Sequence, residues 1–224
     1  MTTTYDTLAT EIADEIADTA LTSQIQLCIA EARRKYDRRR FYFNVKTTTL
    51  STVANQEYYS GAILADSNSV ADIEAIDDVK ILIDTATYPL NPMAFGMMDG
   101  LQTAAVIGDP IAYAYYGQRI RFYPIPGQVR TVTLAYLYKA AAPVFGSGVA
   151  DIWTTEAYDL IRYATKRLLY SNYARGEEQE GIQAALEADA LKDLMAETRQ
   201  RISNGILRTD IPQRHTRFNI VAGW

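Results

Sequence analysis

The chain has 224 residues, of which 48% are hydrophobic and 22% are charged, with a formal net charge of −5. This balance is typical of a globular protein and excludes a disordered chain. One cysteine, Cys28, excludes an intrachain disulfide, and the chain shows neither a signal-peptide pattern at its start nor an apolar run long enough to span a membrane, so we expect it to be made and kept in a cytoplasm.

Residues 1–40 have the apolar spacing of two helices. Leu8, Ile12 and Ile16 recur every fourth residue, which predicts a helix over residues 4–19. The second helix runs from Ser23 to about Arg39, and we expect it to bury Ile25, Cys28 or Ile29, Ala32 and Tyr36. Cys28 lies on this apolar face, so we predict a small buried hydrophobic residue and not a nucleophile.

The second helix ends in six cations within eight positions: Arg33, Arg34, Lys35, Arg38, Arg39 and Arg40. Such a run can contact several phosphates of a nucleic acid. However, helix C-termini attract cations for local reasons, and the flanking segments are acidic, with five acids and no base in 1–30 and nine acids and one base in 47–110. We therefore predict protein contacts, with Arg33, Arg34, Arg38, Arg39 and Arg40 as candidates for contacts between subunits. The alternative is a nucleic-acid-binding module that uses the basic run 33–40 and the C-terminal tail, residues 206–224.

From Phe41 onward the pattern favours strands. The Thr-rich segment 44–50 predicts a strand, and 57–60 is interpreted as its partner. Residues 65–72 are predicted to be a loop, 79–83 a strand, and 85–110 irregular with one short helix at most. The acids Asp72, Glu74, Asp77 and Asp78 lack the spacing of a calcium loop, so we predict a solvated acidic loop and no metal site.

Residues 111–139 carry the clearest strand signal. Tyr113 and Tyr115 alternate, and Gly117-Gln118 fits a two-residue hairpin turn. Beyond it, Ile120 and Phe122 are expected on one face and Arg119 and Arg121 on the other. The segment 124–127 predicts a turn, because proline fixes φ and glycine permits positive φ, and 132–138 predicts a long strand.

Helical spacing returns after a loop at 143–148. We predict a helix over 154–174, a break at Gly176, and a helix over 177–203 with Ile182, Leu186 and Leu194 facing inward. The order of helices, strands and helices predicts an α+β fold. In it, residues 1–40 and 151–205 supply the N- and C-terminal helices of one bundle, and residues 41–150 form an inserted, mainly antiparallel β portion.

Residues 206–224 lack a regular period and are predicted to be an extended docking tail. The tail carries three arginines and ends in large apolar groups, which need a covering surface; the residues are Arg208, Arg214, Arg217, Phe218, Ile220 and Trp224. We favour docking on another subunit, and the alternative is that the tail folds back on its own core.

Residue types that carry catalysis are scarce. The single histidine, His215, and the single cysteine cannot build the usual zinc ligand sets, and Gly96, Gly100 and Gly108 match no phosphate-binding loop. We predict a structural protein that is not an enzyme and has no catalytic residue, cofactor or metal. An enzyme with a metal at residues 72–78 is a further alternative.

The segment Gly108-Asp-Pro-Ile-Ala-Tyr-Ala-Tyr-Tyr-Gly117, followed by 119–126, resembles the head-to-tail adaptor (connector) proteins of tailed bacteriophages. These proteins often show a proline, a Tyr-bearing strand, a glycine, an apolar strand and a Pro-x-Pro turn. The early helix at 29–34 and Trp153 at the start of a later helix agree, and the likeness covers 5–173. One departure is Tyr58-Tyr-Ser-Gly61, where such proteins often have an aromatic-x-Leu-Pro step.

The resemblance implies a virion protein at the head–tail junction, assembled in the host cytoplasm. Such proteins form a dodecameric ring between the portal protein and the tail or nozzle proteins. DNA passes through the lumen without specific binding, and no membrane takes part. C-terminal segments of these proteins reach the portal or neighbouring subunits, so the resemblance assigns that role to Arg208, Arg214, Arg217, Phe218, Ile220 and Trp224.

Overall fold

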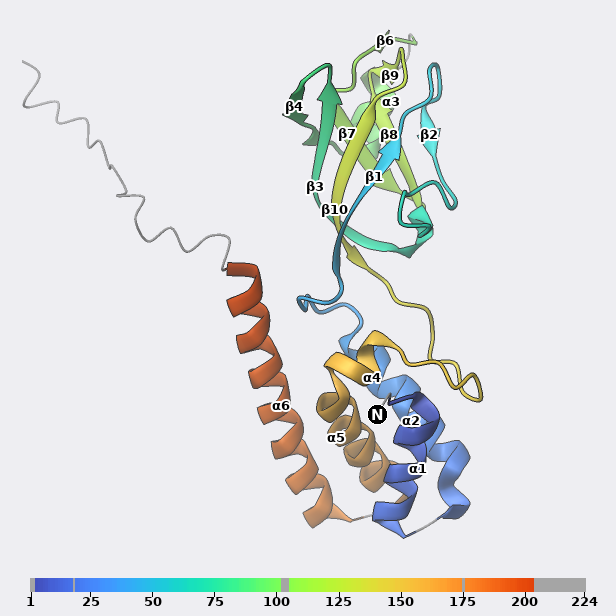
Figure 1. The fold of residues 1–224 in the computed structure, drawn as a ribbon, viewed down its shortest axis with the longest axis vertical. Helices are drawn as coiled ribbons and strands as arrows, with labels where there is room; N and C mark the ends of the chain where they lie inside the picture. Colours follow the sequence, from blue (N-terminus) through green and yellow to red (C-terminus); the bar gives the residue numbers. More distant parts are fainter. Residues whose placement is uncertain (1–2, 18, 102–104, 175, 204–224) are drawn as a thin grey trace, which may run out of the picture.

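The computed structural model describes residues 3–17, 19–101, 105–174 and 176–203, and these residues form a helical bundle and a β part (Figure 1). Two segments connect the parts, one after the second helix and one before the later helices. The fold is α+β, as the order of elements predicts, with the N-terminal and C-terminal helices packed together in one bundle. No helix among the described residues is both long enough and apolar enough to cross a membrane.

The first half of the bundle consists of α1 (Tyr5–Ile16), a 3₁₀ turn η1 (Thr19–Leu21) and α2 (Thr22–Tyr36). Thr4 caps α1 by accepting a hydrogen bond from the Thr7 amide. The apolar positions expected in α2 are confirmed, because each is at most 2% exposed; they are Ile25, Cys28, Ile29, Ala32 and Tyr36. The helical period alone therefore identified the buried face of α2.

The second half of the bundle consists of α4 (Ile152–Glu156), α5 (Tyr158–Leu169), a π turn η3 (Tyr170–Ala174) and α6 (Glu177–Ser203). The single helix expected over 154–174 is thus divided, since the backbone leaves the helical conformation at Ala157. Trp153 at the start of α4 is buried, and its ring meets Phe41 and Phe43 edge-on. These rings join the first connecting segment to the bundle core.

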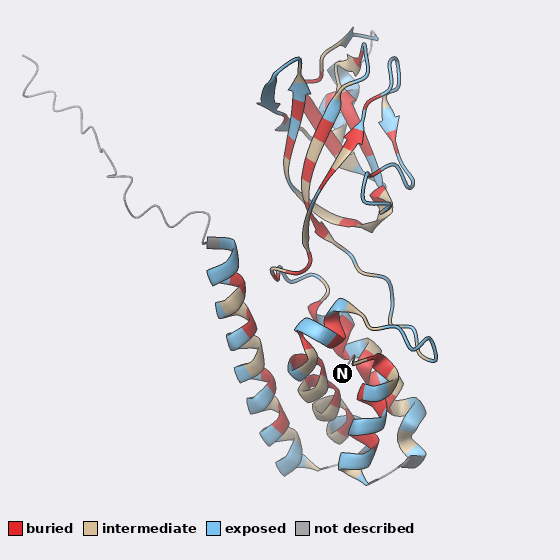
Figure 2. Cartoon of the chain, viewed as in Figure 1, coloured by how far each residue is buried: buried red, intermediate tan, exposed pale blue. Residues whose placement is uncertain are grey.

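The inward face of α6 differs from the expectation. Leu194 is buried as predicted, but Ile182 and Leu186 are 46% and 37% exposed, so their predicted orientation is wrong. The buried positions of α6 lie on the side that faces the rest of the bundle (Figure 2) and include Gln183, Glu187 and Thr198. The inward face of α6 combines these polar groups with Leu194 and with the partly buried Ala190 and Leu191. In the N-terminal half of α6 the inward positions are polar, so apolar spacing did not locate them.

The β part contains two four-stranded sheets that share a core. The first has the order β1 (Val45–Ser51), β10 (Thr131–Tyr138), β3 (Ile73–Ile83), β4 (Ala86–Pro89). The second has the order β2 (Tyr58–Tyr59), β8 (Arg119–Tyr123), β7 (Ala112–Tyr116), β5 (Asn91–Pro92). Leu134 and Ile81 of the first sheet and Ile120 and Phe122 of the second lie in one apolar cluster. The two sheets therefore bury each other's inner faces.

Three further elements complete the β part. A short parallel pair joins β6 (Ile107–Gly108) to β9 (Ile125–Pro126), and α3 (Phe95–Leu101) lies against β7. A 3₁₀ turn, η2 (Val70–Asp72), leads into β3. The predicted two-residue hairpin is present between β7 and β8, where Gly117 and Gln118 have φ values of 57° and 60°. Residues 95–101 supply the short helix foreseen in the irregular segment.

Two expectations about the strands are wrong. The partner of β1 is β10, with Val45 opposite Leu137, whereas β2 pairs with β8. The acids Glu74, Asp77 and Asp78 lie on β3 and not in a loop, because β3 begins at Ile73 and pairs with β10 along its length. In both cases the pairing partner lies far away in the sequence, so the local pattern could not identify it.

Candidate functional site

The structure divides the basic run at the end of α2 into buried and exposed members. Arg33 is 1% exposed and lies between the rings of Tyr5 and Trp153, at 5.9 and 6.0 Å from their centroids. Its Nη1 lies 3.2 Å from Asp151 Oδ2 and its Nε 3.5 Å from Asp37 Oδ1. Arg33 thus faces the interior of its own bundle. Because it is buried there, its prediction as a candidate for contacts between subunits is corrected.

The charges around Arg33 join three helices. The Tyr5 hydroxyl of α1 donates a 2.7 Å hydrogen bond to Asp151, which caps α4 by accepting from the Ile152 amide. Burial raises the pKa of the Asp37 carboxyl, and the nearby Arg33 charge opposes that effect. Burial and the Asp151 hydrogen bond also raise the pKa of the Tyr5 phenol. The cluster is a structural clamp, since its groups compensate one another.

Lys35 and Glu187 form a second polar connection. Glu187 of α6 is 5% exposed and accepts a 2.7 Å hydrogen bond from Lys35 Nζ. Its carboxylate also lies 2.7 Å from Arg167 Nε and accepts from the Tyr36 hydroxyl. Burial, followed by this hydrogen bond, raises the pKa of Tyr36. One carboxylate therefore joins α6 to both α2 and α5.

The exposed cations at the end of the run meet the acids of β3. Arg38 Nε lies 3.4 Å from Glu74 Oε1, and Arg40 forms an ion pair with Asp77. Asp78 pairs with Lys80 at 2.6 Å on the same strand. Within the described ranges, no group of three or more metal-ligating side chains is positioned to hold an ion. Glu74 and Asp77 therefore serve as partners of the basic run, between the bundle and the β part, whereas Asp78 is paired within β3.

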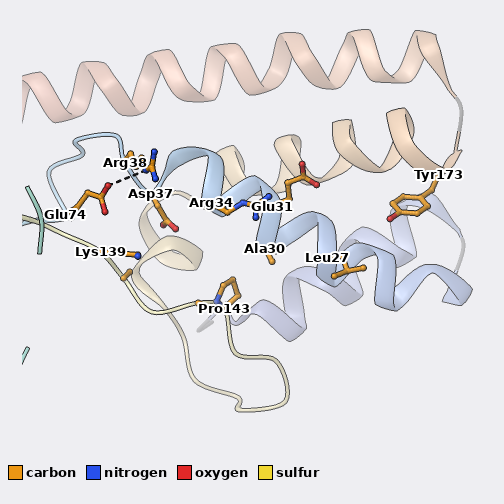
Figure 3. Close-up of a pocket in the computed structure, with 12 residues that line it drawn as sticks. Leu27, Ala30, Glu31, Arg34, Asp37, Arg38, Glu74, Lys139, Pro143 and Tyr173 are labelled. Atoms are coloured by element: carbon orange, nitrogen blue, oxygen red, sulfur yellow. Dashed lines mark ion pairs between the residues drawn. The ribbon is translucent and has the colours of Figure 1, made fainter. Parts of the chain in front are cut away.

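A groove of about 670 Å³ lies beside α2 (Figure 3). Leu27 and Ala30 of α2 contribute apolar lining, as do Pro143 of the second connecting segment and Tyr173; charged residues such as Arg34 complete the lining. Figure 3 shows Arg38, Glu74 and Lys139 at one end of the groove and Leu27 and Tyr173 at the other. A surface that combines apolar and charged side chains is suited to protein contact.

The Cys28 thiol of α2 is buried, and its pKa is raised to about 11 by that burial and by the charge of Glu31.

The sequence contained one weak signal for this groove, which periodicity analysis passed over. Leu27 falls outside the buried stripe of α2 and is 64% exposed. Single exposed apolar residues are common on protein surfaces, so Leu27 indicates a contact surface only together with the groove that it lines. The lining by Pro143 and Tyr173 could not be foreseen, because it depends on how distant segments pack.

A smaller hollow of about 340 Å³ lies on the second sheet of the β part. Arg121 is predicted on the face of β8 opposite Ile120 and Phe122; it is only 5% exposed and pairs with Glu57 at 2.5 Å and with Asp99. Its guanidinium lies 5.1 Å from the ring centroids of both Tyr58 and Phe95. Packing by α3 explains this burial, and the exposed rings of Tyr58 and Tyr116 beside it form a second surface suited to protein contact.

The remaining predicted site residues occupy two classes of position. Arg34, Arg38, Arg39 and Arg40 are exposed, whereas Arg208, Arg214, Arg217, Phe218, Ile220 and Trp224 lie outside the described residues. The arrangement offers charged and apolar surfaces for binding other proteins.

Comparison with known proteins agrees with this description. None of the curated proteins compared with the chain matches it. The sequence profile of a family described as SU10 adaptor protein matches residues 3–210, nearly the whole chain. The chain therefore belongs to the SU10 adaptor protein family of phage structural adaptors.

Proposed function

We propose that the chain forms a dodecameric ring between the portal protein and the tail or nozzle proteins at the head–tail junction of the virion. The ring gives the tail its attachment surface, and DNA passes through its lumen without specific binding or chemical change. Membership of the adaptor family, over residues 3–210, is the observation that carries this proposal.

The surfaces of the molecule support a linking role. A linker needs at least two contact surfaces, and exposed large apolar residues occur on both parts. The bundle exposes Leu27 and Ile182, and the β part exposes Tyr88 and Tyr116 at 50% and 67%. Burial of an exposed apolar side chain under a partner lowers the free energy. Because these side chains lie on the bundle and on the β part, they favour two separate partners.

We also propose that residues 206–224 dock on the portal or on a neighbouring copy. The segment has three bases and one acid and ends in Phe218, Ile220 and Trp224 among other apolar residues. Burial of each large side chain contributes about 1.5–3 kcal/mol. Ordering the backbone costs about 1–2 kcal/mol per residue, so attachment requires main-chain hydrogen bonds and many copies acting together.

The electrostatics favour this role over the alternative of nucleic-acid binding. Four of the six cations in 33–40 have carboxylate partners within the chain, namely Arg33, Lys35, Arg38 and Arg40. These nearby carboxylates reduce the positive potential of the run, and the chain as a whole has a net charge of −5. Non-specific binding of DNA is driven by the release of counterions when Lys and Arg contact phosphates. A lumen wall without excess positive charge would release few counterions, so it would not hold the DNA.

The test is negative-stain electron microscopy of the full chain mixed with its purified portal protein. We expect a ring of density added to one end of the portal. Portals that remain bare at saturating chain would contradict the proposal. Tight, salt-sensitive binding of duplex DNA to the chain would instead favour the nucleic-acid alternative.

A further inference from the structure

The exposed side of α2 carries an ordered stripe. Leu27, Glu31, Arg34 and Arg38 follow one another at i, i+4, i+7 and i+11, and all four are exposed. In a helix this spacing places side chains in one row. The row begins with Leu27 in the middle of α2, and its last member, Arg38, lies two residues beyond Tyr36, the last residue of the helix. Its two cations line the groove (Figure 3).

The helix α6 carries a second stripe with the same spacing. Ile182, Leu186, Asp189 and Asp193 also stand at i, i+4, i+7 and i+11 and are exposed. This row begins with two apolar residues and ends in two carboxylates. When the first residues of the two rows are aligned, three of the four pairs are complementary. The exception is Glu31, which is placed opposite the apolar Leu186.

The two helices run in the same direction. Tyr36, near the end of α2, meets Glu187, and Tyr42, farther along the chain, meets Thr198 and Arg201, farther along α6. In a ring whose axis lies along these helices, rotation from one copy to the next leaves the direction of each helix unchanged. The α2 of one copy and the α6 of its neighbour are therefore parallel. Parallel rows with this order of residues place apolar groups against apolar groups and cations against carboxylates.

The stripes lie on different sides of one copy. α6 stands at one edge of the bundle, and α2 lies across α5 from it (Figure 1). Both rows are exposed, so they do not cover one another within a chain. Between two chains they can meet, and a contact between two different faces is heterologous, so it repeats around a ring.

We propose that the α2 groove receives the N-terminal half of α6 from a second copy of this chain. Leu27 packs against Ile182 and Leu186, and Arg34 faces Asp189. Arg38 is 86% exposed at 3.4 Å from Glu74 of its own chain, and it faces Asp193 as a second carboxylate. Within one chain Tyr36 is level with Glu187, so this pairing shifts one copy by four residues, about 6 Å along the helix axis. A small tilt and the length of the arginine side chains span this distance. The inference rests on the proposed ring.

The first test joins the two stripes covalently. The variant Cys28→Ser removes the native thiol, and Leu27→Cys with Ile182→Cys places one cysteine in each stripe. Phage particles that carry this chain are treated with a mild oxidant and separated on a non-reducing gel. We expect a ladder that extends beyond dimers, because every chain carries both halves of the contact. Each single-cysteine variant, and Tyr88→Cys with Ile182→Cys, serve as controls without a ladder.

The outcomes separate this contact from the ring itself. Particles that contain many copies of the chain but give no ladder would overturn the pairing and leave the ring in place. Particles that contain a single copy would overturn both. Since Leu27 and Ile182 are exposed, circular dichroism should show that the variants fold as the parent chain does.

The second test reverses charges on the full chain. Arg34→Glu and Asp189→Arg should each weaken self-association by about tenfold, because each places like charges together. The double variant should restore it. Arg119→Glu on the β part is the matched control and should have no effect. Sedimentation measures association in solution, and the number of chains per particle measures it in the virion. Additive losses in the double variant by both measures would overturn the pairing.

Discussion

Replacement of Glu187 by alanine tests how α6 is held to the bundle. Glu187 is 5% exposed, and its carboxylate meets Lys35, Arg167 and the Tyr36 hydroxyl. Removal of one member of a buried ion pair costs about 3–5 kcal/mol when the remaining charge stays buried. Lys35 and Arg167 are 42% and 27% exposed and can regain water, so we expect the low end of this range.

The expected loss in the free energy of unfolding is thus about 3 kcal/mol for Glu187→Ala. For a chain of this size it corresponds to a fall in Tm of roughly 6–12 °C. Urea denaturation followed by circular dichroism measures the free energy, and differential scanning calorimetry measures Tm. Both are read on the full chain.

Two variants serve as comparisons. Glu178→Ala removes an exposed carboxylate from the same helix and should change stability by less than about 0.5 kcal/mol. Glu187→Gln keeps an acceptor for Tyr36 but loses the charge, so it should fall between the alanine variant and the parent. A loss below about 1 kcal/mol for Glu187→Ala would show that apolar contacts, and not this carboxylate, hold α6.

Other expected outcomes follow from the clamp, the thiol, the tail and the surface charge. Arg33→Ala should cost about 3 kcal/mol in urea denaturation, because Asp37 and Asp151 lose their counterion but are 24% and 27% exposed and can regain water; a change no larger than that of Arg39→Ala would contradict the clamp. Native Cys28 should label far more slowly than free cysteine at pH 8. Its pKa rises from 9.0 to about 11 on folding, so the stability that it contributes is present below pH 9 and lost as the pH rises toward 11. Labelling at the rate of free cysteine would refute its burial. Deletion of 206–224 should leave the helical signal of the described bundle unchanged and impair attachment to portals; normal attachment would make the tail incidental. Assembled rings should bind duplex DNA weakly at every salt concentration, and tight binding lost in salt would refute a neutral or acidic lumen.

Local patterns in the sequence determined a large part of this protein. The helical period located the buried face of α2, and the glycine and strand alternation located the β7–β8 hairpin, with Ile120 and Phe122 inside. The α+β class followed from the order of elements. These features depend on residues within a few positions of one another, because side-chain direction follows the local backbone period.

Tertiary structure alone decided which distant groups meet. The pairing of β1 with β10, the burial of Arg33 against Asp151 and the orientation of α6 through Glu187 each join segments that are far apart in the chain. Arg33 and Glu187 look like surface residues in sequence, since an isolated charge is too costly to bury. They become interior residues only because the fold brings their counterions to them, which offsets the free energy of removing a charge from water.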